Sequence, residues 1–71
     1  MQIELLETFL DLVESRSFHR TAERLGVTQS TVSARVQALE ASLGARLFNR
    51  SRAGTDLTIE GQRFEQHARY L

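Results

Sequence analysis

Apolar residues recur at helical spacing along most of the chain. Over about residues 2–15 they form one stripe with acidic residues opposite, which predicts an amphipathic helix. The stripe consists of Ile3, Leu6, Phe9, Leu10 and Val13, continued by Phe18, and the acids are Glu4, Glu7, Asp11 and Glu14. A second helix is predicted over 18–25, with Ser17 as its N-cap and Gly26 just after its end.

A third and longer helix is predicted over 29–43. Thr28 is its N-cap and Gly44 follows its end. Its apolar residues lie three and four positions apart, which places them on one narrow stripe: Val32, Val36, Leu39 and Leu43. This stripe is expected to face the core.

The segment after Gly44 predicts a different structure. Leu47-Phe48 and Asp56-Leu57 flank an Arg-, Ser- and Gly-containing stretch, Asn49 to Thr55, which is typical of a small β-hairpin. Thr58 then caps a fourth helix that is expected to continue to the last residue. Its new apolar stripe contains Phe64, His67 or Ala68, and Leu71. The expected fold is mainly α, with three helices, a hairpin and the beginning of another helix.

Residues 18–43 have the character of a helix-turn-helix, since a short turn containing Gly26 joins two helices. Ala22 is small where these helices are expected to cross. The outer face of the third helix carries no acid and no bulky residue: Ser30, Ser33, Ala34, Gln37, Ala38 and Ala41. A solvated helix face usually carries charges, whereas a helix that enters a major groove needs small residues and hydroxyl or amide groups. The alternative is an ordinary helical hairpin.

The charge distribution favours a nucleic-acid partner, although the net charge of the 71 residues is zero. Residues 1–15 have a net charge of −4, residues 16–54 of +5 and residues 55–71 of −1. All nine basic residues are arginine, whose forked donors suit phosphates and guanine edges. A genome rich in G and C explains the choice of arginine equally well.

Several classes of function are excluded by residues that the chain lacks. With no cysteine and two histidines, neither a disulfide nor a zinc site is expected, and no cofactor is indicated. The acids of residues 1–15 lie on an outer helix face with no histidine spaced to join them, so an enzyme is not expected. The N-terminus lacks a basic signal-peptide region and no apolar run could span a membrane, so a soluble, cytoplasmic protein is expected.

An ordered set of residues resembles the N-terminal part of LysR-type transcriptional regulators. The similarity covers essentially the whole chain without gaps. The residues that carry it are Leu6-Glu7-Thr8-Phe9-Leu10, Ser17-Phe18, Ala22, Leu25, Val27-Thr28-Gln29-Ser30, Val32-Ser33, Leu39-Glu40, Leu43-Gly44, Arg46-Leu47-Phe48, Arg50, Leu57-Thr58 and Gly61.

The resemblance implies a winged helix-turn-helix DNA-binding domain over residues 1–58 and the start of a linker and dimerisation helix over 59–71. A larger effector-binding domain normally follows in this family and is absent from the 71 residues. A small-molecule effector would act only through that missing domain. The chain is therefore expected to be a piece of a longer regulator.

Site residues are carried over from the family position by position. Gln29 and Ser33 match positions that face bases or phosphates, and Ser30 and Thr31 lie where hydroxyl and backbone N–H groups hold phosphate. Many relatives have arginine directly after the serine. Here Ala34 takes that place and Arg35 follows, so Arg35 is left open between a base, a phosphate and neither. Arg50 and Arg52 lie in the wing, beside the minor groove.

Two further assignments remain open between function and structure. His19 and Arg20 either contact phosphate or are merely solvated. For the stripe of Phe64, Ala68 and Leu71, a second copy of the same helix is preferred to the core as its partner. That choice implies a homodimer, with a tetramer conceivable for the longer protein. A symmetric dimer would bind double-stranded DNA as an interrupted inverted repeat. The competing hypothesis is a helix-turn-helix protein-interaction module without DNA affinity.

Overall fold

Helices and one hairpin follow each other in the order predicted. The protein was analysed as a computed structural model, which describes residues 2–51 and 54–70. The elements are α1 (Ile3–Ser15), α2 (Phe18–Leu25), α3 (Gln29–Leu43), β1 (Phe48–Ser51), β2 (Gly54–Leu57) and α4 (Ile59–Ala68). This confirms the mainly α fold with a three-helix unit, a hairpin wing and a further helix. None of the helices in the described ranges has the length and apolar character that crossing a bilayer requires.

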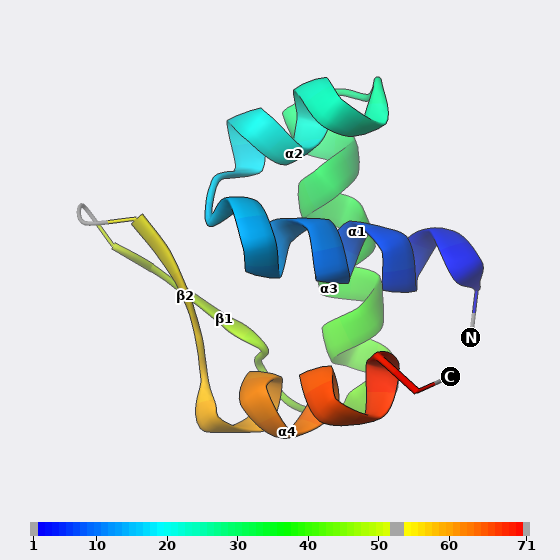
Figure 1. Cartoon of the computed structure of the whole chain (residues 1–71), viewed down its shortest axis with the longest axis vertical. Coiled ribbons are helices and arrows are strands. Elements are labelled where there is room, and N and C mark those ends of the chain that lie inside the picture. Colours follow the sequence, from blue (N-terminus) through cyan, green and yellow to red (C-terminus); the bar gives the residue numbers. More distant parts are fainter. Residues whose placement is uncertain (1, 52–53, 71) are drawn as a thin grey trace.

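The helices surround a small core from which the hairpin projects (Figure 1). α1 packs on both α2 and α3, and α2 packs on α3. α4 contacts α1 and strand β2 at the other end of the domain. β1 and β2 pair antiparallel, with Phe48 opposite Leu57 and Ser51 opposite Gly54. The hairpin therefore extends away from the helices on a base that the core holds.

The predicted caps define the helix ends. Ser17 Oγ accepts a hydrogen bond from the Arg20 N–H, and Thr58 Oγ1 accepts one from the Gly61 N–H. α2 and α3 both end in a glycine in the left-handed region, where φ is 70° for Gly26 and 67° for Gly44. Because glycine has no Cβ, it adopts this conformation without strain. The end of α1 was not anticipated: Arg16 takes a left-handed φ of 56° there.

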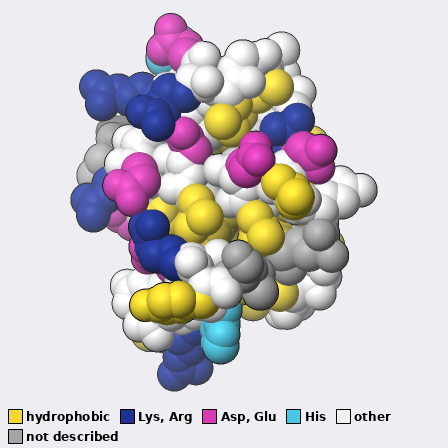
Figure 2. Space-filling model, turned by 45° about the vertical axis from the view of Figure 1, so that its right-hand side comes forward, with side chains coloured by type: hydrophobic (Ala, Val, Ile, Leu, Met, Phe, Trp, Pro, Cys, Tyr) yellow, Lys and Arg dark blue, Asp and Glu magenta, His cyan; other side chains and the backbone are white. Residues whose placement is uncertain are grey.

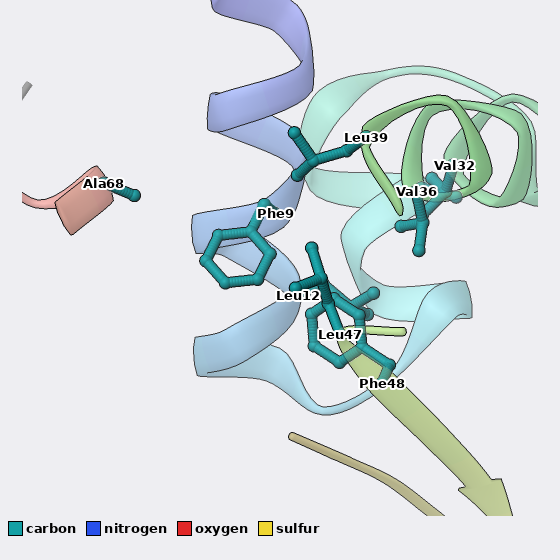
Figure 3. Packing of buried hydrophobic residues seen from close by; sticks show 9 residues of the cluster. Phe9, Leu12, Val32, Val36, Leu39, Leu47, Phe48 and Ala68 are labelled. Atoms are coloured by element: carbon teal, nitrogen blue, oxygen red, sulfur yellow. The ribbon is translucent and has the colours of Figure 1, made fainter. Parts of the chain in front are cut away.

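Phe9 and Leu12 of α1 form the centre of the core. They meet Leu47 and Phe48 at the start of the hairpin, with Val32 and Val36 reaching in from α3 (Figure 3). The Phe9 ring lies 5.4 Å from the Phe48 ring, between centroids. The expected stripes were wrong at two ends: Ile3 is 68% exposed and Leu43 is 38% exposed.

One acid of α1 turns inward, which corrects the expectation that all four lie on the outer face. The Asp11 side chain is only 11% exposed. Its Oδ1 accepts a 2.8 Å hydrogen bond from the Thr21 hydroxyl, and its Oδ2 accepts a 2.8 Å bond from Arg24 Nε. Asp11 therefore joins α1 to α2 with both carboxylate oxygens.

The apolar stripe of α4 also differs from its prediction. Ala68 is 6% exposed and belongs to the core, while the Phe64 ring packs edge-on against Phe9 at 5.1 Å. The expectation that little of the domain covers this stripe is wrong, because α1 covers it. The helix ends at Ala68, with Arg69 and Tyr70 in a turn, and Leu71 lies outside the described residues.

Arg69 fastens the end of α4 to α1. Its guanidinium donates to Glu65 at 2.7 Å and to Glu14 at 3.0 Å. These two side-chain hydrogen bonds, the one to Glu65 first, raise the pKa of Arg69. Because the group is solvent-exposed, the effect on stability is small.

Candidate nucleic-acid interface

The N-terminus of α3 presents polar groups to solvent. Gln29 and Ser30 are exposed, and Thr31 is half-buried. Thr28 Oγ1 accepts the Thr31 N–H at 3.1 Å, so this backbone donor is already used. The N–H groups of Gln29 and Ser30 have no partner among the described residues. Unpaired N–H groups at the positive end of a helix dipole suit a phosphate.

Gln29 belongs to a short polar chain that connects α3 to α2. Its Nε2 lies 3.3 Å from His19 Nδ1, and His19 Nε2 lies 3.3 Å from Glu23 Oε1. All three side chains are exposed. Of the pair left open from the sequence, His19 is thus placed beside a predicted DNA-contact residue. Arg20 is exposed at the start of α2, and its backbone N–H bonds to the Ser17 cap.

Two predicted site residues that are far apart in the sequence meet between the wing and α3. Arg50 Nη2 donates a 2.8 Å hydrogen bond to Ser33 Oγ. The same guanidinium lies over the Phe18 ring, with Cζ 3.5 Å from the ring centroid. The guanidinium of Arg50 on β1 therefore contacts both α3 and α2. Arg52, the second predicted wing residue, lies outside the described residues.

Arg35 takes a separate position. It is half-buried, and its Nη1 lies 3.3 Å from Thr8 Oγ1 on α1. Thr8 itself is fully buried. The contact draws the Arg35 side chain towards α1 and links that helix to α3.

A shallow cleft of about 140 Å³ separates α3 from the hairpin. Phe18, Ser33 and Arg50 line it, together with Gln37 and Arg46. Arg46 was not among the predicted contact residues. Its place between the end of α3 and the hairpin gave no periodic signal, and only the fold brings it close to Arg50. Two arginines, a hydroxyl and an amide around one cleft form a surface that suits a phosphate backbone.

One acid lies at this cleft, but backbone donors hold its carboxylate. Glu40 Oε2 accepts the Leu47 N–H at 2.7 Å and the Phe48 N–H at 3.4 Å. Glu40 thereby fixes the chain where it leaves α3 and enters β1. The acid has a structural role that its position on the edge of the buried stripe did not reveal.

A larger hollow among the described residues has a different character. It measures about 560 Å³ and lies between α1, the hairpin and α4. Arg16 and Arg69 line it, but so do three acids: Glu14, Asp56 and Glu65. Its mixed charge is unsuited to a polyanion. No cluster of three or more metal-ligating side chains occurs within the described ranges.

A family model described as "Bacterial regulatory helix-turn-helix protein, lysR family" matches residues 3–62. The chain belongs to the LysR family. The HTH-type transcriptional regulator HdfR of Yersinia pestis (strain Pestoides F) is 48% identical to this LysR-family chain over 71 residues, covering 100% of the chain and 24% of HdfR. HdfR of Yersinia pseudotuberculosis serotype O:3 (strain YPIII) gives the same values. The chain thus spans about a quarter of the length of these relatives.

Solved structures of LysR-family domains on DNA share this fold. The CbnR DBD–DNA complex superposes with a TM-score of 0.92 at 37% identity, covering 99% of this chain and 80% of that one. The BenM DBD in complex with catB site 1 DNA gives a TM-score of 0.89 at 35% identity, covering 96% and 76%. The chain is a winged helix-turn-helix DNA-binding domain of a LysR-family transcriptional regulator. The competing hypothesis of a protein-interaction module finds no support.

Proposed function

We propose that this domain reads double-stranded DNA with α3 in the major groove and the arginines of the hairpin region on the adjacent backbone and minor groove. The observation that carries the proposal is the position of Arg50, which is held against Ser33 and Phe18 beside the acid-free face of α3. A cation fixed beside a recognition helix approaches phosphate in a defined register. Such contacts orient a helix over the bases that it reads.

Base reading is assigned to the exposed N-terminal part of α3. The Gln29 amide has the donor and acceptor that a bidentate contact with adenine needs. Ser33 shares its hydroxyl with Arg50, so its contact with DNA is coupled to the wing. Ser30 and Thr31 provide hydroxyl groups for phosphate or base edges. Exposed Ala34 and Ala38 allow the helix to approach the groove closely.

Backbone binding is assigned to the arginines around the cleft. Arg50 and Arg46 line it directly. Arg52 is assigned to the minor groove from its place in the wing, where a basic side chain reads groove width. Arg35, drawn towards α1 by Thr8, is the weaker candidate for phosphate contact.

The wider assembly is proposed from the family. Residues 1–58 would form the reading unit and residues 59–71 the start of the linker helix. A homodimer would place two copies of α3 on an interrupted inverted repeat. Since Phe64 and Ala68 pack within the chain, the exposed apolar residues are better candidates for the contact surface: Ile3, Leu43, Ile59 and Tyr70. In Figure 2, hydrophobic side chains reach the surface in the middle of the face shown, beside acidic ones.

In the longer regulator, the domain that follows would join dimers into a tetramer and would bind a small-molecule effector. The working compartment of a regulator that binds bacterial DNA is the cytoplasm. The described residues account for the DNA-reading step and include the candidates for the dimer contact.

A duplex titration over a salt series tests the DNA contacts. Fluorescence anisotropy with an A·T-flanked inverted repeat should show affinity falling steeply with salt. The slope of the logarithm of the binding constant against the logarithm of the salt concentration should be about −0.9 for each phosphate contact. Arg50→Ala should weaken binding to all duplexes and flatten the slope, whereas Gln29→Ala should reduce discrimination among duplexes. Arg63→Ala is the matched control, because it removes an equal charge from the exposed side of α4.

Sedimentation of the same samples separates failure to pair from failure to bind. If a dimeric, folded chain ignores DNA even at low salt, the interaction-module hypothesis replaces the proposal. If Arg63→Ala weakens binding as much as Arg50→Ala, only total charge matters and the assigned interface is wrong.

A further inference from the structure

The contact between Gln29 and His19 has a consequence for base selection. A glutamine amide can present its oxygen and nitrogen in either of two orders, because a rotation of about 180° at the amide exchanges them. The two orders are not equivalent for a bidentate contact. Adenine offers the N7 acceptor beside the N6 donor, so the amide must place its N–H at N7 and its oxygen at N6.

The neighbours of His19 determine which order Gln29 adopts. Glu23 Oε1 lies 3.3 Å from His19 Nε2, and a carboxylate at this distance favours a proton on that nitrogen. In the neutral ring, Nδ1 is then an acceptor. Nδ1 faces Gln29 Nε2 at 3.3 Å, so the amide nitrogen donates to it. The Glu23 carboxylate and the Gln29 amide nitrogen thus both favour the tautomer that carries its proton on Nε2.

In this arrangement, the Gln29 amide keeps two groups free. One N–H is used by His19, while the second N–H and the carbonyl oxygen remain for a base. These are the donor and acceptor that adenine requires. The His19 contact therefore leaves the reading edge intact and prevents the amide from rotating freely.

We propose that His19 is a positioning residue that sets the orientation of the Gln29 amide and thereby the base that Gln29 selects. This inference rests on the proposed base contact of Gln29. In this proposal, His19 on α2 affects which base is selected by orienting Gln29, without contacting the base itself.

Protonation of His19 reverses the arrangement. Both nitrogens of a doubly protonated imidazole ring are donors. Nδ1–H would require the Gln29 oxygen, so the amide would rotate and exchange its outward groups. Glu23 from α2 and Gln29 from α3 are the groups that contact the ring, and no other described charged side chain does. The added positive charge would meanwhile strengthen attraction to phosphate.

Base preference and total affinity should therefore move in opposite directions as the pH falls. The probe is a synthetic pool of duplexes with randomised half-sites, sequenced before and after binding at about pH 8 and about pH 5.5. The position read by Gln29 is the one whose preference disappears in Gln29→Ala. There, the adenine preference of the wild-type chain should fall by about fivefold at the lower pH, within the range that one bidentate contact supplies.

Three variants test the role of the ring. His19→Phe keeps a ring without nitrogen, and at the higher pH it should lose about fivefold in adenine preference and all of the pH dependence. His19→Gln, which can accept from Gln29 but does not titrate, should restore part of the preference with a flat pH profile. His67→Gln is the matched control, since His67 is the other histidine and is exposed on α4. It should behave as wild type.

A measurement without DNA supports the same test. The side-chain amide resonances of Gln29 in the free domain should shift with pH in the wild-type chain and in His67→Gln, but not in His19→Phe. Thermal unfolding of each variant checks that an effect is local, as expected for an exposed residue.

The outcomes distinguish the positioning role of His19 from the base contact of Gln29. If Gln29→Ala erases a preference but His19→Phe retains both that preference and its pH dependence, the positioning role is overturned and the proposed DNA contact stands. If Gln29→Ala changes no preference, the proposed role of Gln29 fails and the inference about His19 fails with it.

Discussion

Arg50 Cζ lies 3.5 Å from the centroid of the Phe18 ring, while Nη2 of the same guanidinium donates to Ser33 Oγ at 2.8 Å. A cation over an aromatic face is attracted by the ring quadrupole, and its planar group keeps one orientation. This contact spans 32 positions of sequence and gives the exposed Arg50 side chain fixed partners before DNA arrives. An ordered cation loses less entropy on binding than a freely rotating one.

Replacing the ring should therefore weaken DNA binding without removing any charge. Phe18→Leu keeps an apolar side chain of similar burial but removes the aromatic face. We expect affinity for DNA to fall by about twofold to fivefold, in line with an exposed cation–π contact of ~0.5–1 kcal/mol. Anisotropy titration measures this loss, and thermal unfolding should show destabilisation of less than about 1.5 kcal/mol.

The matched variant is Arg50→Lys, which retains the charge but not the planar fork. It should lose affinity to a similar degree as Phe18→Leu, and the double variant should lose little more than either alone, because both remove one contact. Fully additive losses in the double variant would mean that Phe18 and Arg50 act independently.

Gly61 marks a close approach between α4 and the hairpin. A Cβ at this position would clash with the backbone oxygen of Leu47 and would lie 2.7 Å from Leu57 Cδ2. Gly61→Ala should destabilise the domain by about 1–3 kcal/mol despite the better helix propensity of alanine. Differential scanning calorimetry should record a Tm lower by about 10 °C for a domain of this size.

Gln62→Ala is the control for Gly61→Ala, since Gln62 is exposed on the same turn of α4. It should change stability by less than about 0.5 kcal/mol. Equal stability of Gly61→Ala and Gln62→Ala would show that α4 can move away from Leu47 at no cost.

The elements that the sequence predicted correctly are those with local signals. Ser17, Thr28 and Thr58 each cap a helix through a bond to the backbone three residues on, and Gly26 and Gly44 end helices through their own φ. Such signals depend on a few consecutive residues, so no knowledge of the tertiary fold is needed. The hairpin was also recognised, and its strands extend further towards the tip than the apolar pairs alone indicated.

What escaped prediction depends on contacts between distant segments. Asp11 fits the acidic outer pattern of α1 until Thr21 and Arg24 are placed against it by α2. The sequence predicted that Phe64 and Ala68 lack cover within the domain, because periodicity does not show that Phe9 packs against Phe64 or that Ala68 joins the core. The candidate site likewise combines residues that the sequence predicted with contacts that it did not. Gln29, Ser33 and Arg50 were named from the resemblance, but the contacts that orient them, with His19 and Phe18, follow from the fold alone.

The inward-facing acid gives a further prediction. Asp11→Ala removes both acceptors from the contact with Thr21 and Arg24 and should destabilise the domain by about 1–3 kcal/mol. Urea unfolding measures the difference. Glu7→Ala, on the exposed side of the same helix, should change stability by less than about 0.5 kcal/mol.

High salt separates the two partners of Asp11. Arg24 is 69% exposed, so its ion pair is screened, whereas the bond from fully buried Thr21 is not. Most of the Asp11→Ala loss should therefore persist in about 1 M salt. A loss that disappears in salt would assign the stabilisation to the ion pair instead.

Substitutions of Glu40 should affect the stability of the domain and its affinity for DNA differently. Its Oε2 accepts the backbone N–H of Leu47 at 2.7 Å, and Leu47 is 1% exposed, so removal of this acceptor leaves a donor without a partner at the root of the hairpin. Glu40→Ala should destabilise the domain by about 2–3 kcal/mol. Glu40→Gln keeps an oxygen acceptor but loses the charge, and should destabilise it by about 1 kcal/mol, since charge-assisted bonds are roughly twice as strong as neutral ones.

Although Glu40→Gln should lower the stability of the domain, it should not lower its affinity for DNA. The carboxylate lines the same cleft as Arg46 and Arg50, so removing its charge leaves the cleft more positive. At low salt we expect affinity to be unchanged or to rise by about twofold, and the gain should vanish as salt screens the charges. Urea unfolding and anisotropy on the same protein samples measure both quantities. A fall in affinity comparable to that of Arg50→Ala would instead mean that the position of the hairpin depends on the charge of Glu40.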